Sequence, residues 1–302
     1  MASLERVSQH RRLMHSSNLL PVILVCAMGA IDLVWNFFVH LQWNPPTAMF
    51  AGPAYICLAL FVICKIVWPN KTAMELFLFL GLWVLFAIFG SQLSYLAATF
   101  DLPLRDPMMK TIDARMGFDW VVWFNFVWAH PLLGRILVYV YESYIFQPIL
   151  LIAILAFSHL RGRNREFLVS MIFSVTLVIA ISALLPAYGP PHAYSIATSW
   201  DEALTDLRKG AHVSYGYVGI VTFPSFHACV AVLFTLAMRG HLLAFVTAAI
   251  LNSMMLLSIL PLGGHYLVDL IAGCAIAALS FWAAQATIAL WNAETSPVAS
   301  RE

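Results

Sequence analysis

Charged side chains are scarce in this chain of 302 residues: only 10% of its residues are Asp, Glu, Lys or Arg, while 62% are hydrophobic. No soluble domain has this composition, whereas a helical protein with several membrane spans does. The net charge of +1 gives no basic surface for nucleic acid, so nucleic-acid binding is excluded.

The sequence also lacks a cysteine framework. Its five cysteines all lie in apolar stretches, without the spacing of a metal site or a disulfide scaffold. No pair of acidic residues has the spacing of a Mg²⁺ site. We therefore expect the cysteines to be packing residues, and we expect neither a metal nor a cofactor.

A cleavable signal peptide, an internal repeat and a low-complexity tract are missing as well. The arginines at 6–12 precede an apolar run at residues 19–41, which is too long for a signal peptide. No small-residue cleavage site follows this run. It is expected to form the first transmembrane helix.

What the chain does contain is a series of apolar stretches of membrane-spanning length. They predict an all-α integral membrane protein with about eight transmembrane helices and a catalytic core in the C-terminal helices. We expect an N-terminal helix pair in residues 1–70, a membrane core in 71–291 and a short cytoplasmic tail in 292–302. The predicted spans are residues 19–41, 47–68, 72–100, 131–158, 165–187, 225–239, 242–261 and 265–291.

Two segments are not expected to cross the membrane. Residues 103–130 carry Met108, Met109 and Met116 at helical spacing and end in a group of aromatic residues. This pattern predicts an amphipathic helix in the membrane interface with an aromatic belt. Residues 188–222 form the longest polar stretch, and we expect this outer loop to serve function.

The distribution of Lys and Arg predicts the orientation, because cytoplasmic loops carry an excess of these residues. With eight spans, both termini lie inside, and the side holding fewer cations is the outer one. A short chain without processing signals favours a bacterial inner membrane, whose outer side is periplasmic. The inner side holds Arg6, Arg11, Arg12, Lys65, Lys71, Arg161, Arg163, Arg165, Arg239 and Arg301, and the outer side holds Arg105, Lys110, Arg115, Arg208 and Lys209.

Two short motifs fall together on the predicted outer side: Pro-Ser-Phe-His, which ends at His227, and His265-Tyr-Leu-Val-Asp269. Positions i and i+4 of a helix share a face, so Asp269 can accept a hydrogen bond from one ring nitrogen of His265. The other nitrogen is then free as a nucleophile, and His227 can protonate a leaving group. Two histidines and a carboxylate indicate phosphoryl transfer through a phosphohistidine.

A structural interpretation competes with this one. A single histidine in a membrane helix is usually a packed or interfacial residue, and a His–Asp pair at i and i+4 can simply stabilise a helix. The presence of Ser225 and His227 on the same predicted side as His265 and Asp269 favours the catalytic interpretation.

The two motifs resemble those of the type-2 phosphatidic-acid phosphatase superfamily. Its second motif commonly has glycine where this chain has Phe226, and its third motif has arginine where this chain has Ile259, after Ser258. Its first motif, Lys-x6-Arg-Pro, is absent. These departures, with Tyr266 after the histidine, resemble the branch of inositol-phosphorylceramide and sphingomyelin synthases.

The resemblance implies a role for each matching residue. His265 would attack phosphorus, Asp269 would orient it, and His227 would protonate the departing oxygen and then activate the acceptor. Ser225, with backbone N–H groups at the start of its helix, would hold phosphate oxygens. Gly264, just before the reactive histidine, can allow close approach of substrate or can simply form a turn.

The missing motif arginines leave the transferred phosphate without a cation, although phosphoryl transfer depends on charge stabilisation. Arg208 and Lys209 in the outer loop are the first candidates for that cation. His192 in the same loop and Arg135 in the fourth predicted span are the others. Arg208 and Lys209 could equally be solvated loop charges.

The predicted function is a membrane lipid phosphatase or phosphotransferase that cleaves a lipid phosphate ester at the outer leaflet. Water as acceptor would make it a hydrolase, and a lipid or sugar hydroxyl would make it a transferase. The alternatives are a transporter that uses intramembrane Asp32 and Glu142 and a non-catalytic lipid-binding protein. The expected partners are a lipid phosphate and the bilayer, and the sequence predicts no oligomeric state.

Overall fold

A computed structural model describes residues 18–41, 46–158, 160, 162–196, 198–210 and 219–295, and within these ranges every regular element is a helix. The helices are α2 (Leu19–Val39), α3 (Pro46–Ile66), α4 (Lys71–Ala98), α5 (Asp106–Arg115), α6 (Trp120–Ala129), α7 (Pro131–Glu142), η1 (Ser143–Ile145), α8 (Gln147–Phe157), α9 (Gly162–Leu184), α10 (Pro190–Ala193), α11 (Ser199–Arg208), α12 (Phe226–Ala237), α13 (Leu242–Leu262) and α14 (Leu267–Glu294).

Five of these helices, namely α2, α4, α9, α13 and α14, are long and apolar enough to cross a membrane. The prediction of an all-helical membrane protein is thereby confirmed, while the count of eight spans stays a prediction. The predicted span 131–158 is interrupted, since it forms α7, η1 and α8. Pro148 in the first turn of α8 has no N–H to continue the helical hydrogen bonds, which accounts for the break.

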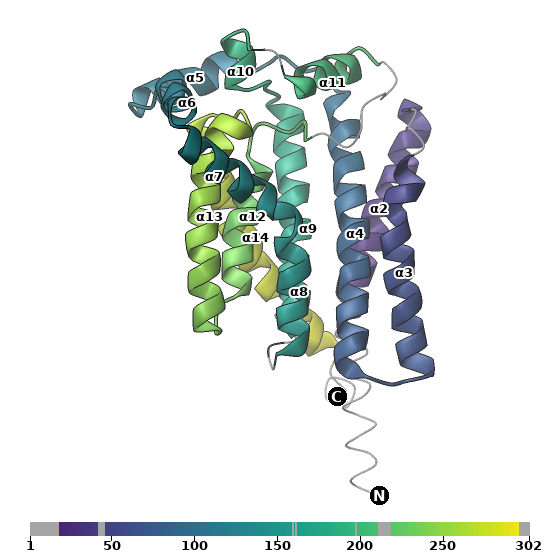
Figure 1. Cartoon of the computed structure of the whole chain (residues 1–302). Coiled ribbons are helices and arrows are strands. Elements are labelled where there is room, and N and C mark those ends of the chain that lie inside the picture. The colour runs from purple at the N-terminus through teal and green to yellow at the C-terminus, as the bar shows by residue number, and fades with distance from the viewer. Residues whose placement is uncertain are drawn as a thin grey trace, which may run out of the picture.

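The central helix of the bundle is α9, because 61% of its apolar window is buried inside the protein, compared with 22% for α2 and for α13. Figure 1 shows α2 and α3 beside α4 on one side of the bundle and α13 on the other. Aromatic side chains join α4, α9 and α12: Trp83 stacks on Phe167 with ring centroids 5.5 Å apart, and Phe167 lies 5.8 Å from Phe234. This core holds the helices that carry the candidate site.

Four helices, α5, α6, α10 and α11, lie across one end of the bundle (Figure 1). The single interfacial helix predicted for residues 103–130 is wrong in one respect, because the segment forms two helices separated at Gly117, whose φ is +78°. The predicted outer loop 188–222 includes the short helices α10 and α11. Its residues 197 and 211–218 lie outside the described part of the chain.

The predicted apolar residues of α5 are mostly exposed. Met108 and Met116 are exposed, at 42% and 43%, whereas Asp106, Met109 and Asp113 are buried. The two carboxylates point inward, where each accepts hydrogen bonds from backbone N–H groups. The place of this helix in the membrane interface stays a prediction, and the inward acidic face is a feature that the sequence analysis did not predict.

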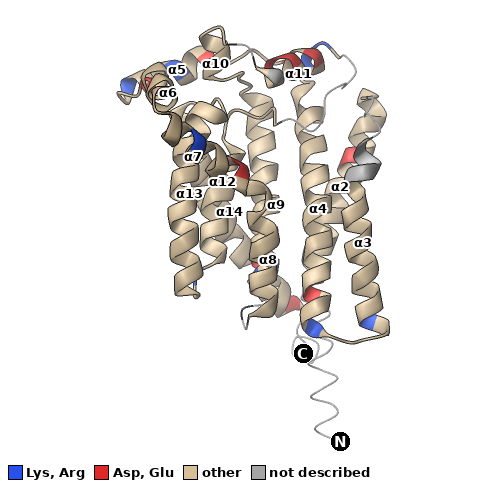
Figure 2. Cartoon of the chain, viewed as in Figure 1, with Lys and Arg blue, Asp and Glu red and all other residues tan. Residues whose placement is uncertain are grey.

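Lys and Arg gather at the two ends of the bundle, as Figure 2 shows for α3 and α4 at one end and for α5 and α11 at the other. The start of α9 lies at the same end as the start of α4, since Asn164 donates to Glu75 over 3.1 Å. The predicted inner residues Arg6, Arg11, Arg12, Arg161 and Arg301 lie outside the described residues. Which end faces the cytoplasm stays a prediction.

Candidate functional site

The start of α14 brings His265 and Asp269 together. Nδ1 of His265 lies 3.3 Å from Oδ2 of Asp269, and the same oxygen accepts the backbone N–H of Tyr266 at 2.8 Å. Both side chains are buried, with His265 3% exposed. The carboxylate therefore fixes the orientation of the imidazole and leaves Nε2 to face the rest of the site.

The N-terminus of α12 lies against this pair. Ser225 caps α12 by accepting the N–H of Ala228, and its Oγ lies 3.4 Å from Nε2 of His265. The backbone N–H of Ser225 also donates to the carbonyl oxygen of Asp269 over 3.1 Å. Helices can approach this closely because α14 has Gly273 there, where a Cβ atom would collide with the carbonyl oxygen of Ser225.

His227, in the first turn of α12, sits between two tyrosines. Its ring stacks on Tyr141 with centroids 5.0 Å apart and meets Tyr144 edge-on at 4.8 Å. Its Nε2 is buried and has no hydrogen-bond partner among the described residues. A buried imidazole nitrogen without a partner is available to exchange a proton with a bound molecule.

Gly263, the residue after α13, packs against both His265 and Tyr141. A Cβ atom at this position would lie 2.8 Å from Cδ2 of His265 and 3.3 Å from the hydroxyl oxygen of Tyr141, the tyrosine that stacks on His227. A side chain larger than hydrogen would therefore press on the ring of His265 and on Tyr141. His227, His265 and Asp269 lie at the same end of the bundle, and their catalytic roles stay a prediction.

Gly264 approaches the loop above the site. Its φ is +63°, and a Cβ atom there would lie 2.9 Å from both Cγ of Pro191 and Cζ2 of Trp200. Its carbonyl oxygen is in turn close to Gly189, which has a φ of +101°. The backbone between α13 and α14 is thus covered by α10 and α11, and close approach requires glycine at both positions.

Asp106 joins the covering loop to the site. Its carboxylate accepts the N–H of Tyr188 at 3.1 Å, the N–H of Gly189 at 2.8 Å and the hydroxyl of Tyr266 at 3.2 Å. The residue that follows His265 and the loop before α10 are therefore held by one buried side chain of α5.

Asp113, two turns further along α5 on the same face as Asp106, caps the first turn of α14. Its two carboxylate oxygens accept the N–H groups of Leu267 and Val268 at 2.8 and 2.9 Å. Burial raises the pKa of Asp113, and the two backbone N–H groups oppose that shift. A carboxylate at a helix N-terminus also interacts favourably with the helix dipole.

Burial has the opposite effect on His265, which lies outside the span formed by α14. It lowers the pKa of His265 to about 4, against a smaller raising effect of a hydrogen bond with the backbone of Thr222. A histidine with this pKa is neutral at pH 7, as a nitrogen nucleophile must be.

The predicted phosphate-binding cations lie away from these groups. Arg208 pairs with Asp101 at 2.7 Å and donates to the carbonyl oxygen of Leu102 at 2.8 Å. Lys209 and Arg135 are exposed. In the part of the chain that the structure describes, no Lys or Arg side chain forms an ion pair or hydrogen bond with the two histidines, Ser225 or Asp269.

His192, the remaining predicted anion ligand, belongs to α10, one of the helices that cover the site. Its ring stacks on Tyr188 with centroids 4.3 Å apart, and its Nδ1 lies 3.7 Å from Oδ2 of Asp201. Half of its side chain is exposed. It is therefore a residue of the covering loop rather than a contact of His265, and its predicted role in substrate binding is untested.

Reasoning from the sequence missed Asp106 and Asp113. Their spacing places them on one face of a helix with Met109 between them, so a signal was present. It was overlooked because the analysis followed the methionines of this segment, which predicted an interfacial helix, and gave no role to its polar face. Tyr141 and Tyr144, spaced to share a face, were also missed, and no motif marks them.

In the described residues, no group of three His, Cys, Asp or Glu side chains is arranged to hold a metal ion. His265 and Asp269 nevertheless provide a nucleophile and its orienting base without one. A buried serine hydroxyl and the N-terminus of α12 lie beside the free nitrogen of His265. This arrangement can carry out group transfer to and from a histidine.

A comparison with known protein families matches residues 108–283 to the PAP2 superfamily, and this segment contains both motifs, with Ser225, His227, His265 and Asp269. No curated protein and no solved structure matches the chain. The match supports an integral membrane enzyme with phosphatase-type activity on lipid phosphates in general. Because the matched segment covers more than half of its length, the chain belongs to the PAP2 superfamily.

Proposed function

We propose that this protein transfers the phosphoryl group of a membrane lipid through a phosphohistidine at His265. The observation that carries the proposal is the pair formed by Nδ1 of His265 and the carboxylate of Asp269, which directs Nε2 toward Ser225 and the end of α12. A histidine that only stabilised the helix would not need a second histidine with an unpartnered nitrogen beside it.

In the first step, Nε2 of His265 attacks phosphorus while the bond between phosphorus and the oxygen of the leaving alcohol breaks. His227 gives its proton to that oxygen, so that the alcohol leaves neutral. Asp269 stabilises the positive charge that develops on His265 as the N–P bond forms.

In the second step, an acceptor hydroxyl attacks the phosphohistidine while the N–P bond breaks. His227, now neutral, takes the acceptor proton and returns to its starting state. Water as acceptor releases a phosphate product, and an alcohol yields a new phosphoester. The same residues serve both outcomes.

Ser225 and the first N–H groups of α12 are proposed to hold the phosphate oxygens. The hydroxyl of Ser225 lies 3.4 Å from the attacking nitrogen, which is the region that a bound phosphate would occupy. Backbone N–H groups at a helix N-terminus bind anions without a charged side chain. This matters because no described Lys or Arg side chain forms an ion pair or hydrogen bond with His227, His265 or Ser225.

A phosphodiester is the substrate that the charges favour. Asp106, Asp113 and Asp269 are buried around the start of α14, and no described guanidinium or ammonium balances them there. A diester carries one negative charge, whereas a monoester carries up to two near neutral pH, so repulsion is smaller for the diester. This supports head-group transfer of the kind performed by the sphingolipid synthases that the chain resembles.

The sequence assigns ten Lys and Arg residues to the opposite side of the membrane and five to this one, which supports an active site on the outer leaflet. In a bacterial inner membrane this side is periplasmic. The lipid would then reach the site from the outer leaflet, beneath α5 and α6.

The test uses the purified full-length protein in detergent, supplied with labelled phosphomonoester and phosphodiester lipids, with and without an alcohol acceptor. We expect label in a new lipid only when acceptor is present, and label on the protein after an alkaline quench. Both signals should disappear in His265→Ala and persist in His130→Ala, a change of an exposed histidine.

Release of free phosphate from a monoester alone would replace the transferase by a phosphatase. A His265→Ala variant that turns over lipid as well as the wild type would overturn the mechanism. Solute transport that survives His265→Ala, without any lipid turnover, would identify a transporter instead.

A further inference from the structure

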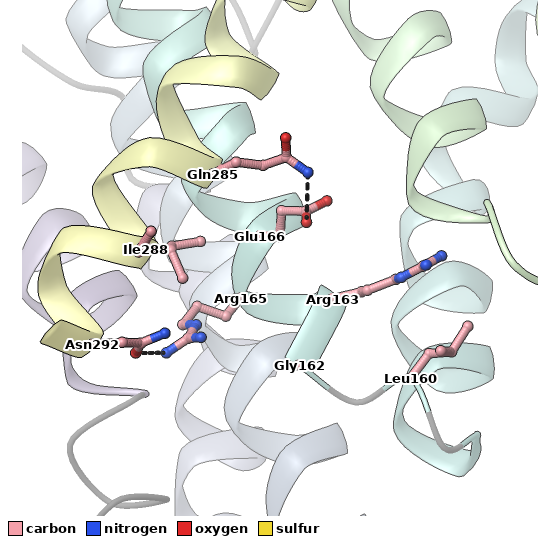
Figure 3. A pocket seen from close by; sticks show the side chains of 9 residues that line it. Leu160, Gly162, Arg163, Arg165, Glu166, Gln285, Ile288 and Asn292 are labelled. Carbon is pink, nitrogen blue, oxygen red and sulfur yellow. Dashed lines mark hydrogen bonds between the residues drawn. The ribbon is translucent and has the colours of Figure 1, made fainter. Parts of the chain in front are cut away.

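A second polar feature lies at the opposite end of the bundle from the histidines, between the first turn of α9 and the last turns of α14 (Figure 3). It is an open cavity of about 500 Å³, and Arg163, Arg165, Glu166, Gln285 and Asn292 provide its polar lining. Cavities of this size hold small ligands or head groups. Nothing in the proposed chemistry uses these residues.

The charge of this cavity is positive. Glu166 is its one lining carboxylate, and its Oε2 is already bound to Arg239 at 2.6 Å. Arg165 donates to the neutral amide oxygen of Asn292 at 3.1 Å. Figure 3 shows Arg163 and Arg165 extending to either side of the α9 turn from which both arise.

Arg163 provides an independent sign of a missing partner. Its Nη1 is buried and makes no hydrogen bond with any described residue. The guanidinium packs against the turn after α12, where a Cβ atom on Gly240 would lie 3.2 Å from both of its terminal nitrogens. A buried guanidinium N–H without an acceptor favours an anionic ligand.

The rest of the lining is apolar and is provided by Leu160, Ile288 and Ala289. Both α9 and α14 are candidate membrane spans, so their ends mark the boundary between the bilayer and water. A cavity with arginines beside apolar walls at this depth fits a phosphate that carries acyl chains better than a free ion. Basic pockets between transmembrane helices are known binding sites for anionic head groups.

We propose that this cavity binds the phosphate head group of an anionic phospholipid from the leaflet opposite the catalytic residues, with Arg163 and Arg165 as its ligands. The first N–H groups of α9 add to the attraction for the phosphate. The inference does not depend on the chemistry proposed at the other end. The site would anchor the bundle at its charged end.

The test measures lipid binding to the full-length protein by native mass spectrometry. The probes are phosphatidylglycerol, phosphatidylcholine with the same acyl chains, and inorganic phosphate. We expect phosphatidylglycerol to bind at least about tenfold more tightly than phosphatidylcholine, and Arg163→Gln with Arg165→Gln to weaken its binding by about fivefold for each arginine removed.

Two double variants serve as controls. Lys65→Gln with Lys71→Gln removes two positive charges at the same end but outside the cavity, and binding should stay within about twofold of the wild type. Arg163→Lys with Arg165→Lys keeps both charges, so it should bind more tightly than the glutamine pair. Tighter binding by a correctly folded lysine variant would show that the glutamine variant loses affinity through its missing charges and not through unfolding alone.

Equal binding of the two lipids by the wild type would overturn the proposal, as would unchanged binding of phosphatidylglycerol by the glutamine pair. Displacement of phosphatidylglycerol by an equal concentration of inorganic phosphate would show a site for the free ion and would refute the lipid. A loss of binding in the Lys65→Gln and Lys71→Gln control would show that general surface charge, and not the cavity, attracts the lipid. That result would also overturn the proposal.

Discussion

The Oδ1 atom of Asp113 accepts a hydrogen bond from the backbone N–H of Val268, 2.9 Å away, although 155 positions separate the two residues in the chain. The other carboxylate oxygen binds the N–H of Leu267. A helix that lies across the end of the bundle therefore fixes the first turn of the helix that carries Asp269. The position of His265 and Asp269, the proposed catalytic pair, therefore depends on a residue that takes no part in the proposed bond changes.

Asp113→Asn tests this dependence. An amide has one acceptor oxygen, so one of the two N–H groups of α14 would face an NH₂ group instead of an acceptor. We expect the free energy of unfolding to fall by about 1–3 kcal/mol, and kcat to fall with little change in KM. Thermal or denaturant unfolding and initial rates on the labelled lipid measure the two effects.

Asp119→Asn is the matched control, because Asp119 caps α6 through the N–H groups of Val121 and Val122 in the same manner. A single oxygen of this exposed residue accepts both bonds, and Asn is as good an N-cap as Asp. Stability and rate should therefore change little. If both substitutions changed stability and rate equally, Asp113 would contribute no more than an ordinary helix cap.

Asp269→Asn tests the orientation of the nucleophile. The amide can still lie beside His265, but it cannot stabilise the positive ring that forms during attack. We expect kcat to fall by about 1,000-fold or more, with substrate affinity nearly unchanged. Rapid-quench measurement of the labelled protein should show slow formation of the phosphohistidine. A fall of less than about tenfold would remove Asp269 from the mechanism.

The pH dependence of kcat/KM follows from the environment of His265. Attack requires the neutral ring, and burial lowers the pKa of His265 to about 4. The rate should therefore be lost only as the pH falls toward 4, well below the usual range of a histidine. An acid limb near pH 6.5 would contradict the burial of His265.

Gly264→Ala separates steric contact from backbone strain. The new methyl group would meet Pro191 and Trp200 at 2.9 Å, in addition to the cost of an alanine at φ +63°. Gly117→Ala has a φ of +78° but nothing within 4 Å, so it should cost about 1–2 kcal/mol from the backbone alone. We expect Gly264→Ala to destabilise the protein more than this and to reduce turnover.

Chelation tests the absence of a metal from the proposed steps. A histidine nucleophile, a carboxylate and a second histidine complete the bond changes without a Lewis acid. Turnover by the purified protein should therefore survive EDTA at a concentration that inactivates a Mg²⁺-dependent phosphatase assayed in parallel. Loss of activity with rescue by added Mg²⁺ would refute this mechanism.

The grouping of the catalytic residues could be predicted from the sequence because it rests on local spacing. His265 and Asp269 share a helix face, and Ser225 and His227 lie at the start of another apolar helix, so the motifs alone brought them near one surface. The roles of Asp106 and Asp113 could not be predicted in this way. Their partners are backbone N–H groups from distant turns, and a backbone donor leaves no trace in the sequence.

The membrane spans show the same contrast: the apolar runs could be predicted from the local sequence, but the breaks and bends within them could not. The apolar run predicted at 165–187 forms α9, which has the length and hydropathy of a membrane span. The predicted span at 131–158 breaks around Pro148, and the chain bends by 108° between α6 and α7. Hydropathy does not reveal such bends, because a broken helix and a continuous helix can have the same mean hydropathy.

The two helix N-termini at the catalytic end are capped by groups of different charge. The dipole of α14 meets the carboxylate of Asp113, whereas that of α12 meets only the neutral hydroxyl of Ser225. A full negative charge cancels the positive potential at the first helix end, and a hydroxyl leaves it largely intact at the second. The start of α12 therefore keeps a positive potential that Asp113 removes from the start of α14, and under the proposed mechanism this potential would attract an anionic substrate toward Ser225.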